Sequence, residues 1–140
     1  MQNPLMPAKR ASCCARYDAV VGAVLRELRK RQGQNLKITA ERGGLALSSL
    51  SQYEFGVMAI HVWVLHQWAP AVGAEPWVVL EAADAIVEEN AAFLTVVPRC
   101  KAKSSTAVLK RLAPAFMSGL VRDWYLRKDQ GSGGGGILGS

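Results

Sequence analysis

The sequence predicts an all-α protein with five short helices and a helical C-terminal extension. Apolar residues recur at intervals of three and four along much of the 140-residue chain, which is the spacing of one helix face. Glycines follow several of these segments, where helices commonly end. At residues 93–97 (FLTVV) the pattern does not distinguish a short strand from the end of the fifth helix.

The first two helices are predicted near the N-terminus. Residues 17–31 carry apolar side chains at positions 17, 20, 21, 24, 25 and 28, and Gly33 suits the left-handed conformation that ends a helix. A second, short helix follows over residues 36–42. Asn35 is its expected N-cap, and Gly43–Gly44 is its exit.

The third, fourth and fifth helices follow in quick succession. Residues 46–55 form the third helix, so a glycine-containing turn joins it to the second. Residues 60–73 form the fourth, which Pro70 should distort or shorten, because proline lacks the backbone donor. Residues 75–90 form the fifth, with Pro76 well placed in its first turn.

The segments outside these helices differ in composition. The apolar stripe 108, 112, 116, 120 and 124 indicates a helical extension, which Pro114 should split or kink. The expected organisation is a disordered basic arm (1–16), a helical domain (17–90), a basic linker (91–103), a helical extension (104–128) and a flexible glycine-rich tail (129–140).

The charge is unevenly distributed. The chain has a net charge of +6. Residues 1–42 hold nine lysines and arginines and three acidic side chains, and residues 43–98 hold six acidic side chains and no lysine or arginine. Residues 99–140 hold eight lysines and arginines and two acidic side chains. Basic ends suit a polyanion such as nucleic acid, although a solvated basic surface explains them equally well.

Several classes of protein are disfavoured. The longest apolar region, 57–80, is interrupted by histidine, glutamine, proline and glutamate, so it is too polar for a membrane span. The N-terminus lacks the apolar core of a secretory signal, while its basic character leaves a transit peptide open. The three cysteines, two of them adjacent, make a poor disulfide framework. We therefore expect a cytoplasmic protein without membrane contact.

The segment Val21–Leu80 resembles the lambda-repressor-like, or XRE, helix-turn-helix family. The segment "VGAVLRELRKRQG" is similar to the first helix of that family, and the segment "LSQYEFG" is similar to the end of its third helix. No gap is needed between Gly33 and Gly73. The positions that carry the resemblance within and after the turn are Ala40, Gly44, Leu45, Leu50, Glu54, Gly56, Leu65, Ala69 and Val72.

The resemblance implies that the third helix enters the major groove of double-stranded DNA. Its outer face is small and uncharged, and hydroxyl and amide groups of this kind hydrogen-bond to base edges. The alternative is a tight helix–helix contact through the serines. On the DNA-binding interpretation the core-facing residues are Leu45, Leu50 and Tyr53, and the base-reading residues are Leu47, Ser48, Ser49, Ser51 and Gln52.

The resemblance also implies phosphate contacts and one structural ion pair. The expected phosphate-binding residues surround the second helix and are Gln34, Asn35, Lys37 and Arg42. Arg29 and Glu54 match the family pair that links the first helix to the end of the third. The alternative for this pair is two solvated side chains.

No catalytic or metal-binding pattern is present in the sequence. His61 and His66 are five residues apart and have no third ligand nearby, so we expect no metal, no cofactor and no enzymatic activity. Trp63, Trp68 and Trp77 are interpreted as core or interface residues. The predicted function is sequence-specific transcriptional regulation by a homodimer, with repression favoured over activation. The alternative is a protein-binding module such as an antitoxin, with a protein partner.

Overall fold

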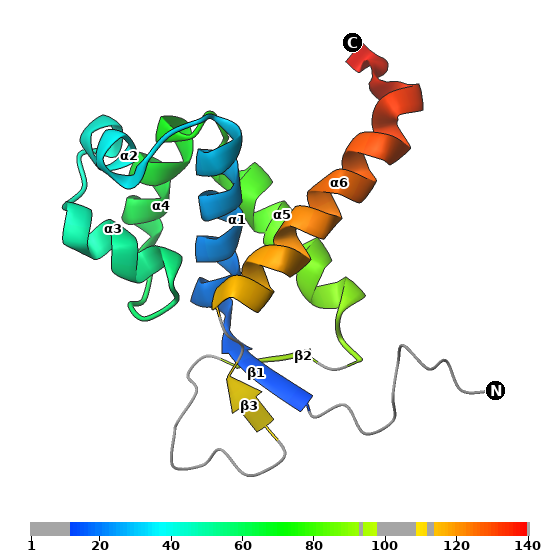
Figure 1. Ribbon diagram of the computed structural model, residues 1–140, viewed down its shortest axis with the longest axis horizontal. Helices are drawn as coiled ribbons and strands as arrows, with labels where there is room; N and C mark the ends of the chain where they lie inside the picture. Colours follow the sequence, from blue (N-terminus) through cyan, green and yellow to red (C-terminus); the bar gives the residue numbers. More distant parts are fainter. Residues whose placement is uncertain (1–11, 93, 98–108, 112–113, 140) are drawn as a thin grey trace.

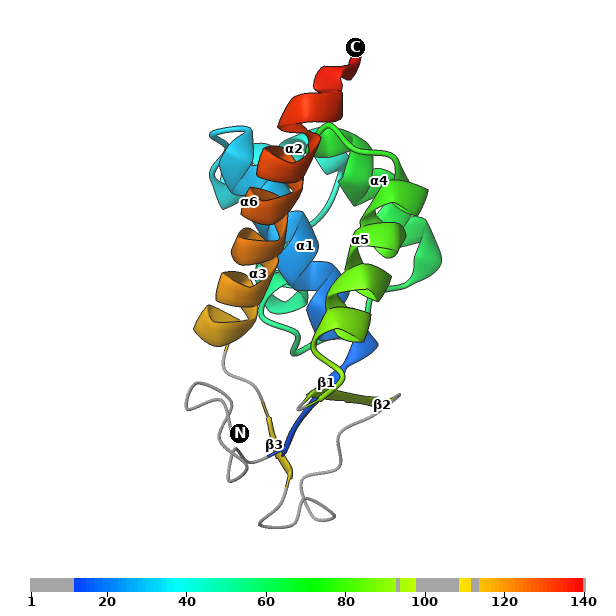
Figure 2. The ribbon, with the colours of Figure 1, turned by 90° about the vertical axis from the view of Figure 1, so that its right-hand side faces the viewer.

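The computed structural model describes residues 12–92, 94–97, 109–111 and 114–139. Helices make up most of this part of the chain, which confirms the all-α class, and three very short strands accompany them (Figures 1 and 2). The helices are α1 (Tyr17–Arg31), α2 (Leu36–Gly43), α3 (Leu47–Glu54), α4 (Val62–Ala71), α5 (Pro76–Glu89) and α6 (Pro114–Gly139).

The boundaries of α1 to α5 follow local signals in the sequence. The Ile38 N–H donates to Asn35 Oδ1 at 2.8 Å, so Asn35 caps α2 as expected. Gly44 ends α2 in the left-handed conformation, at φ +66°. Pro70 lies one residue before the end of α4, where a missing backbone donor disturbs little of the helix. Pro76 is the first residue of α5.

Helix α1 is central to the packing and contacts α3, α5 and α6 (Figures 1 and 2). The core gathers fully buried side chains from α1, α3, α4 and α5, among them Leu25, Leu50, Trp68 and Ile86. At Gly22, α1 comes unusually near α3, since a Cβ built there would lie 2.3 Å from the Tyr53 carbonyl oxygen. Only glycine permits this approach, which sets the position of α3 against the core.

The three strands form one small parallel sheet below the helices, in the order β2-β1-β3 (Figure 1). Strand β1 is Ser12–Arg16, β2 is Leu94–Val97 and β3 is Leu109–Arg111. Cys13 pairs with Leu94 on one side and with Lys110 on the other. The sheet therefore joins the start of α1 to the segments that follow α5 and precede α6.

This sheet differs from the expected organisation in three places. Ser12–Arg16 is a strand and not the end of a disordered arm, and Leu109–Arg111 is a strand and not part of a helix. The segment expected as a linker contains β2, which confirms the strand alternative of the two left open at residues 93–97. The pairings join distant parts of the chain, so no local pattern encodes them. Residues 1–11, 98–103 and 104–108 of the expected arm, linker and extension lie outside the described residues.

Helix α6 also differs from the expected extension. Pro114 is its first residue and causes no kink within it. Its buried side chains are Met117, Ser118 and Val121, whereas Phe116 of the expected stripe is exposed. Leu120 and Trp124 of the stripe are partly buried and pack against the core, so the expected face is correct at these two positions and wrong at Phe116. Positions 108 and 112 of the stripe both lie outside the described residues.

The segment 131–139, expected as part of a flexible tail, belongs to α6 in the structure. Glycine costs about 1 kcal/mol per residue in a helix relative to alanine, which is why the composition predicted a tail. Residue 140 lies outside the described part of the chain.

Candidate nucleic-acid interface

A tight turn places α2 and α3 against each other in a helix–turn–helix arrangement. The Leu45 N–H donates to the Ala40 carbonyl at 2.9 Å and so closes the end of α2. From α4, Gln67 Nε2 donates to the Gly43 carbonyl at 2.9 Å. The turn is thus held both by its own backbone and by the next helix.

The two faces of α3 are clearly different. Leu50 and Tyr53 are buried in the core, and Leu45 in the preceding turn packs against it. On the other face Ser48 and Gln52 are exposed, and Leu47 has an exposed fraction of 48%. Ser49 and Ser51 are half-buried at the sides. The structure therefore places three of the five predicted base-reading residues, Leu47, Ser48 and Gln52, fully on the outer face.

Arg29 and Glu54 meet in a buried, bidentate ion pair. Arg29 Nε donates to Glu54 Oε2 at 2.7 Å, and its Nη2 donates to Oε1 at 3.0 Å. The Glu54 side chain is only 2% exposed. Arg29 Nη1 also donates to the Gln34 carbonyl at 2.8 Å. One guanidinium group on α1 thereby fixes both the end of α3 and the segment that enters α2.

A second arginine beside Glu54 was not predicted. Arg26 Nε lies 3.7 Å from Glu54 Oε1, and Arg26 Nη1 donates to the Ser118 hydroxyl at 2.6 Å. Its guanidinium also lies over the Phe55 ring, 5.7 Å from the ring centre. Arg26 therefore links α6 to the end of α3. The sequence signal was the position of Arg26, which precedes Arg29 by three residues on the same helix face.

Of the four predicted phosphate-binding residues, three are exposed around α2 and one is not. Asn35, Lys37 and Arg42 are at the surface. Gln34 is only 7% exposed, so its predicted phosphate contact is wrong. Its Nε2 donates to the Ala71 carbonyl at 2.9 Å, and its Oε1 accepts from the Thr39 hydroxyl. Both ends of the amide are occupied, and Gln34 ties α2 to the end of α4.

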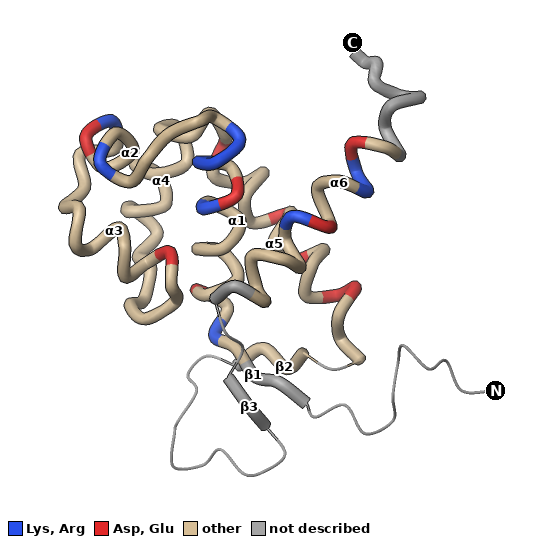
Figure 3. The backbone as a smooth tube through the Cα atoms, in the orientation of Figure 1, with Lys and Arg blue, Asp and Glu red and all other residues tan. Residues whose placement is uncertain are grey.

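The electrostatics of this face are mild. Lys37 and Arg42 supply positive charge on α2, beside Glu41, while the only charged residue of α3 is the buried Glu54 (Figure 3). Backbone N–H groups at the start of each helix add partial positive charge. A ligand that met this surface would find hydrogen-bonding groups on α3 and cations on α2.

The remaining candidate groups lie elsewhere. Trp68 is fully buried in the core, while Trp63 and Trp77 are largely exposed. No cluster of three or more potential metal ligands occurs among the described residues. None of the helices in that part of the chain is long and apolar enough to cross a membrane.

The fold and the outer face of α3 define an all-α domain with a helix–turn–helix surface, and the comparison with solved structures agrees with this class. The chain is similar to the clp gene regulator ClgR from Corynebacterium glutamicum, with 29% sequence identity and a TM-score of 0.51. The match covers 54% of this chain and 81% of that one. A second structure of the same regulator matches with 29% identity and a TM-score of 0.47, over 49% of this chain and 90% of that one.

No family model matches the chain, and no curated protein sequence matches it at a significant level.

Proposed function

We propose that this protein is a sequence-specific DNA-binding regulator of transcription, of the lambda-repressor-like type, with α3 in the major groove. The observation that carries the proposal is the outer face of α3, where Leu47, Ser48 and Gln52 are exposed and uncharged. Amide and hydroxyl groups read base edges by hydrogen bonds, and a leucine contacts the thymine methyl group. A helix that only covers the core would carry charged residues on its outer face.

The similarity to ClgR supports a regulatory role. The two proteins share 29% identity over most of the ClgR chain, and that protein is described as a gene regulator. The likeness covers about half of the present chain, so it bears on the domain that contains α3 more than on the whole protein.

In the proposed complex, α2 and α3 have different tasks. Lys37 and Arg42 contact phosphates beside the groove, and Asn35 lies at the α2 N-terminus, where free backbone N–H groups also bind anions. The buried Arg29–Glu54 pair holds α3 at a fixed angle to α1. Sequence is read by α3, while affinity comes from α2 and the phosphates.

We further propose that the protein acts as a homodimer and represses transcription. One recognition helix covers only a few base pairs, so two copies are normally required to specify an operator. A dimer bound across a promoter would exclude other proteins from the same DNA. The expected operator is an inverted repeat whose half-sites are one helical turn apart.

Selection of bound fragments from a random DNA library tests this proposal, followed by mobility shifts on the selected site. Two cationic side chains per copy predict that log affinity falls with log salt with a slope of about −2 per copy, or about −4 for a dimer. Lys37→Ala should weaken binding to the selected site and binding to random DNA by the same factor. Failure to enrich any sequence would contradict sequence-specific binding.

The second candidate function is a protein-binding module such as an antitoxin. It is supported by exposed apolar side chains at and after α3, namely Leu47, Phe55 and Val57. A protein partner would cover these residues, whereas DNA would contact Leu47 alone among them on the proposed face. Binding of a protein partner with an affinity that does not depend on salt, together with the absence of any DNA mobility shift, would favour this function over the first.

A further inference from the structure

A pocket of about 620 Å³ lies away from the proposed DNA-binding face. It is formed by the start of α1, the segment before α4, α4 itself and the start of α5, and none of its lining residues belongs to α2 or α3. Its volume is within the range of sites that hold small molecules. It is therefore a separate candidate site and not an extension of the DNA-binding surface.

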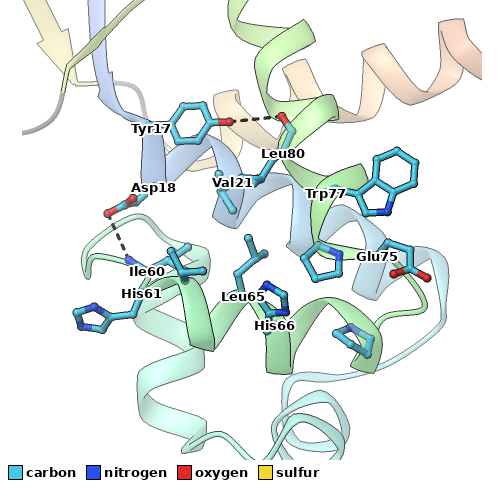
Figure 4. A pocket seen from close by; sticks show the side chains of 13 residues that line it. Tyr17, Asp18, Val21, Ile60, His61, Leu65, His66, Glu75, Trp77 and Leu80 are labelled. Atoms are coloured by element: carbon cyan, nitrogen blue, oxygen red, sulfur yellow. Dashed lines mark hydrogen bonds between the residues drawn. The ribbon is translucent and has the colours of Figure 1, made fainter.

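The walls of the pocket are mainly apolar. In Figure 4, Trp77 and Glu75 lie together on one side of the pocket, and Asp18, Ile60 and His61 lie on the opposite side. The Trp77 side chain is 63% exposed, so its ring is accessible to a ligand. The other apolar residues that line the pocket are Val21, Val62, Leu65, Pro70, Pro76 and Leu80.

The charged groups of the pocket are both acidic, and only one is uncompensated. Asp18 Oδ2 accepts from Arg16 Nη2 at 2.7 Å and from the Ile60 N–H at 3.3 Å. Glu75 has no ion-pair partner among the described residues, and neither lysine nor arginine lines the pocket. The surrounding segment 43–98 contains no lysine or arginine. The remaining polar side chains of the pocket are Tyr17, His61 and His66.

We propose that this pocket binds a small apolar molecule with a positively charged amino group. The apolar body lies between α4 and α5, and the ammonium group lies beside Glu75 and over the Trp77 ring. An aromatic face and a carboxylate together are a favourable environment for an ammonium ion. The proposal goes beyond DNA binding and does not depend on it.

The dipoles of α4 and α5 oppose this charge preference, but the N-terminus of α4, which begins after His61, lies on the side of the pocket opposite Glu75 (Figure 4). Val62 and Pro76, the first residues of α4 and α5, both line the pocket. Each helix N-terminus carries about half a positive charge, which would favour an anion. Glu75 carries a full negative charge directly before α5. Its charge therefore exceeds that of the α5 dipole at the position where the ligand's amino group would lie.

Three probes of the same shape test the charge preference: 3-phenylpropylamine, 3-phenylpropan-1-ol and 3-phenylpropanoic acid. Each is titrated into the isotope-labelled full chain, and the Trp77 indole signal, assigned with Trp77→Phe, is followed by NMR. The amine should bind about tenfold more tightly than the alcohol, which corresponds to about 1.4 kcal/mol. The acid should bind more weakly still, and added salt should reduce the advantage of the amine.

Two glutamates of the same region provide the variant and its control. Glu75→Gln should lower the affinity for the amine to that for the alcohol, while leaving the fold intact because the side chain is exposed. Glu88→Gln, an exposed position of α5 that does not line the pocket, should change neither affinity. Equal losses in both variants would contradict a specific role of Glu75.

Three outcomes would overturn the proposal. The acid binding as tightly as the amine would show that the helix dipoles, and not Glu75, determine the charge preference. No shift of the Trp77 signal with any probe would show that no small molecule binds. A concentration-dependent Trp77 signal, together with sedimentation as a dimer, would show that a second copy of the chain occupies this surface.

Discussion

Replacing Gly22 with alanine should destabilise the protein, although alanine is the better helix former. The new Cβ would lie 2.3 Å from the Tyr53 carbonyl oxygen and 3.3 Å from its carbon. Both are backbone atoms, so relief requires α1 and α3 to separate by about 1 Å. Such overpacking costs typically about 1–3 kcal/mol, while the helix preference returns at most about 1 kcal/mol. With a cost near the upper end of the overpacking range, the free energy of unfolding should fall by about 2 kcal/mol in total.

Thermal denaturation followed by circular dichroism measures this loss, which should lower the Tm by about 8 °C. The matched control is Gly119→Ala in α6, where the nearest atom to a new Cβ is Arg122 Nη2 at 4.0 Å. There the same change should stabilise the protein by about 0.5–1 kcal/mol. If Gly22→Ala is as stable as the wild type, the close approach of α1 and α3 does not exist in solution and the argument fails.

Three further predictions concern the ion pair, the DNA-binding face and alkaline pH. Arg29→Ala and Glu54→Ala should each cost about 3–5 kcal/mol, and the double variant should lose less than the sum; a double-mutant cycle with no coupling would disprove the pair. Ser48→Ala and Gln52→Ala should each weaken binding to the selected DNA site by about 1–3 kcal/mol but barely affect random DNA in mobility shifts. Burial and a neighbouring carboxylate raise the pKa of Tyr17 in the folded protein. The neutral phenol therefore stabilises the fold fully at pH values below the pKa of tyrosine in the unfolded chain, about 10. This stabilisation is lost as the pH rises from there towards the pKa in the folded protein. Urea denaturation above about pH 10 should therefore show a steeper loss of stability in the wild type than in Tyr17→Phe.

The sequence predicted most of the fold where local signals are strong. The N-cap at Asn35, the left-handed glycine at Gly44 and the first-turn proline at Pro76 each bias the backbone within a few residues. The helices from α1 to α5 therefore begin and end close to the predicted positions. The inward and outward faces of α3 follow from helical periodicity in the same way.

The errors concern features that depend on tertiary contacts. Gln34 stands beside the α2 N-terminus in sequence, which suggested a phosphate contact, but the end of α4 covers it and uses its amide. Helical periodicity gives no signal for the role of Gly22, since its close approach to Tyr53 is a property of two helices. Periodicity placed Leu120 and Trp124 of α6 against the core but selected Phe116 in place of Met117, because both neighbouring positions are apolar.

The parallel pairing of β1 has a consequence for the order in which the protein folds. Its two partner strands lie beyond α5, so β1 is made first and has no hydrogen-bonding partner until β2, directly after α5, has been synthesised. The helices from α1 to α5 have mostly local contacts and can form earlier on the ribosome. The sheet and the docking of α6 are then the last events. Synthesis of α6, and not synthesis of the helix–turn–helix segment, would mark the point at which Arg26 gains its partner Ser118.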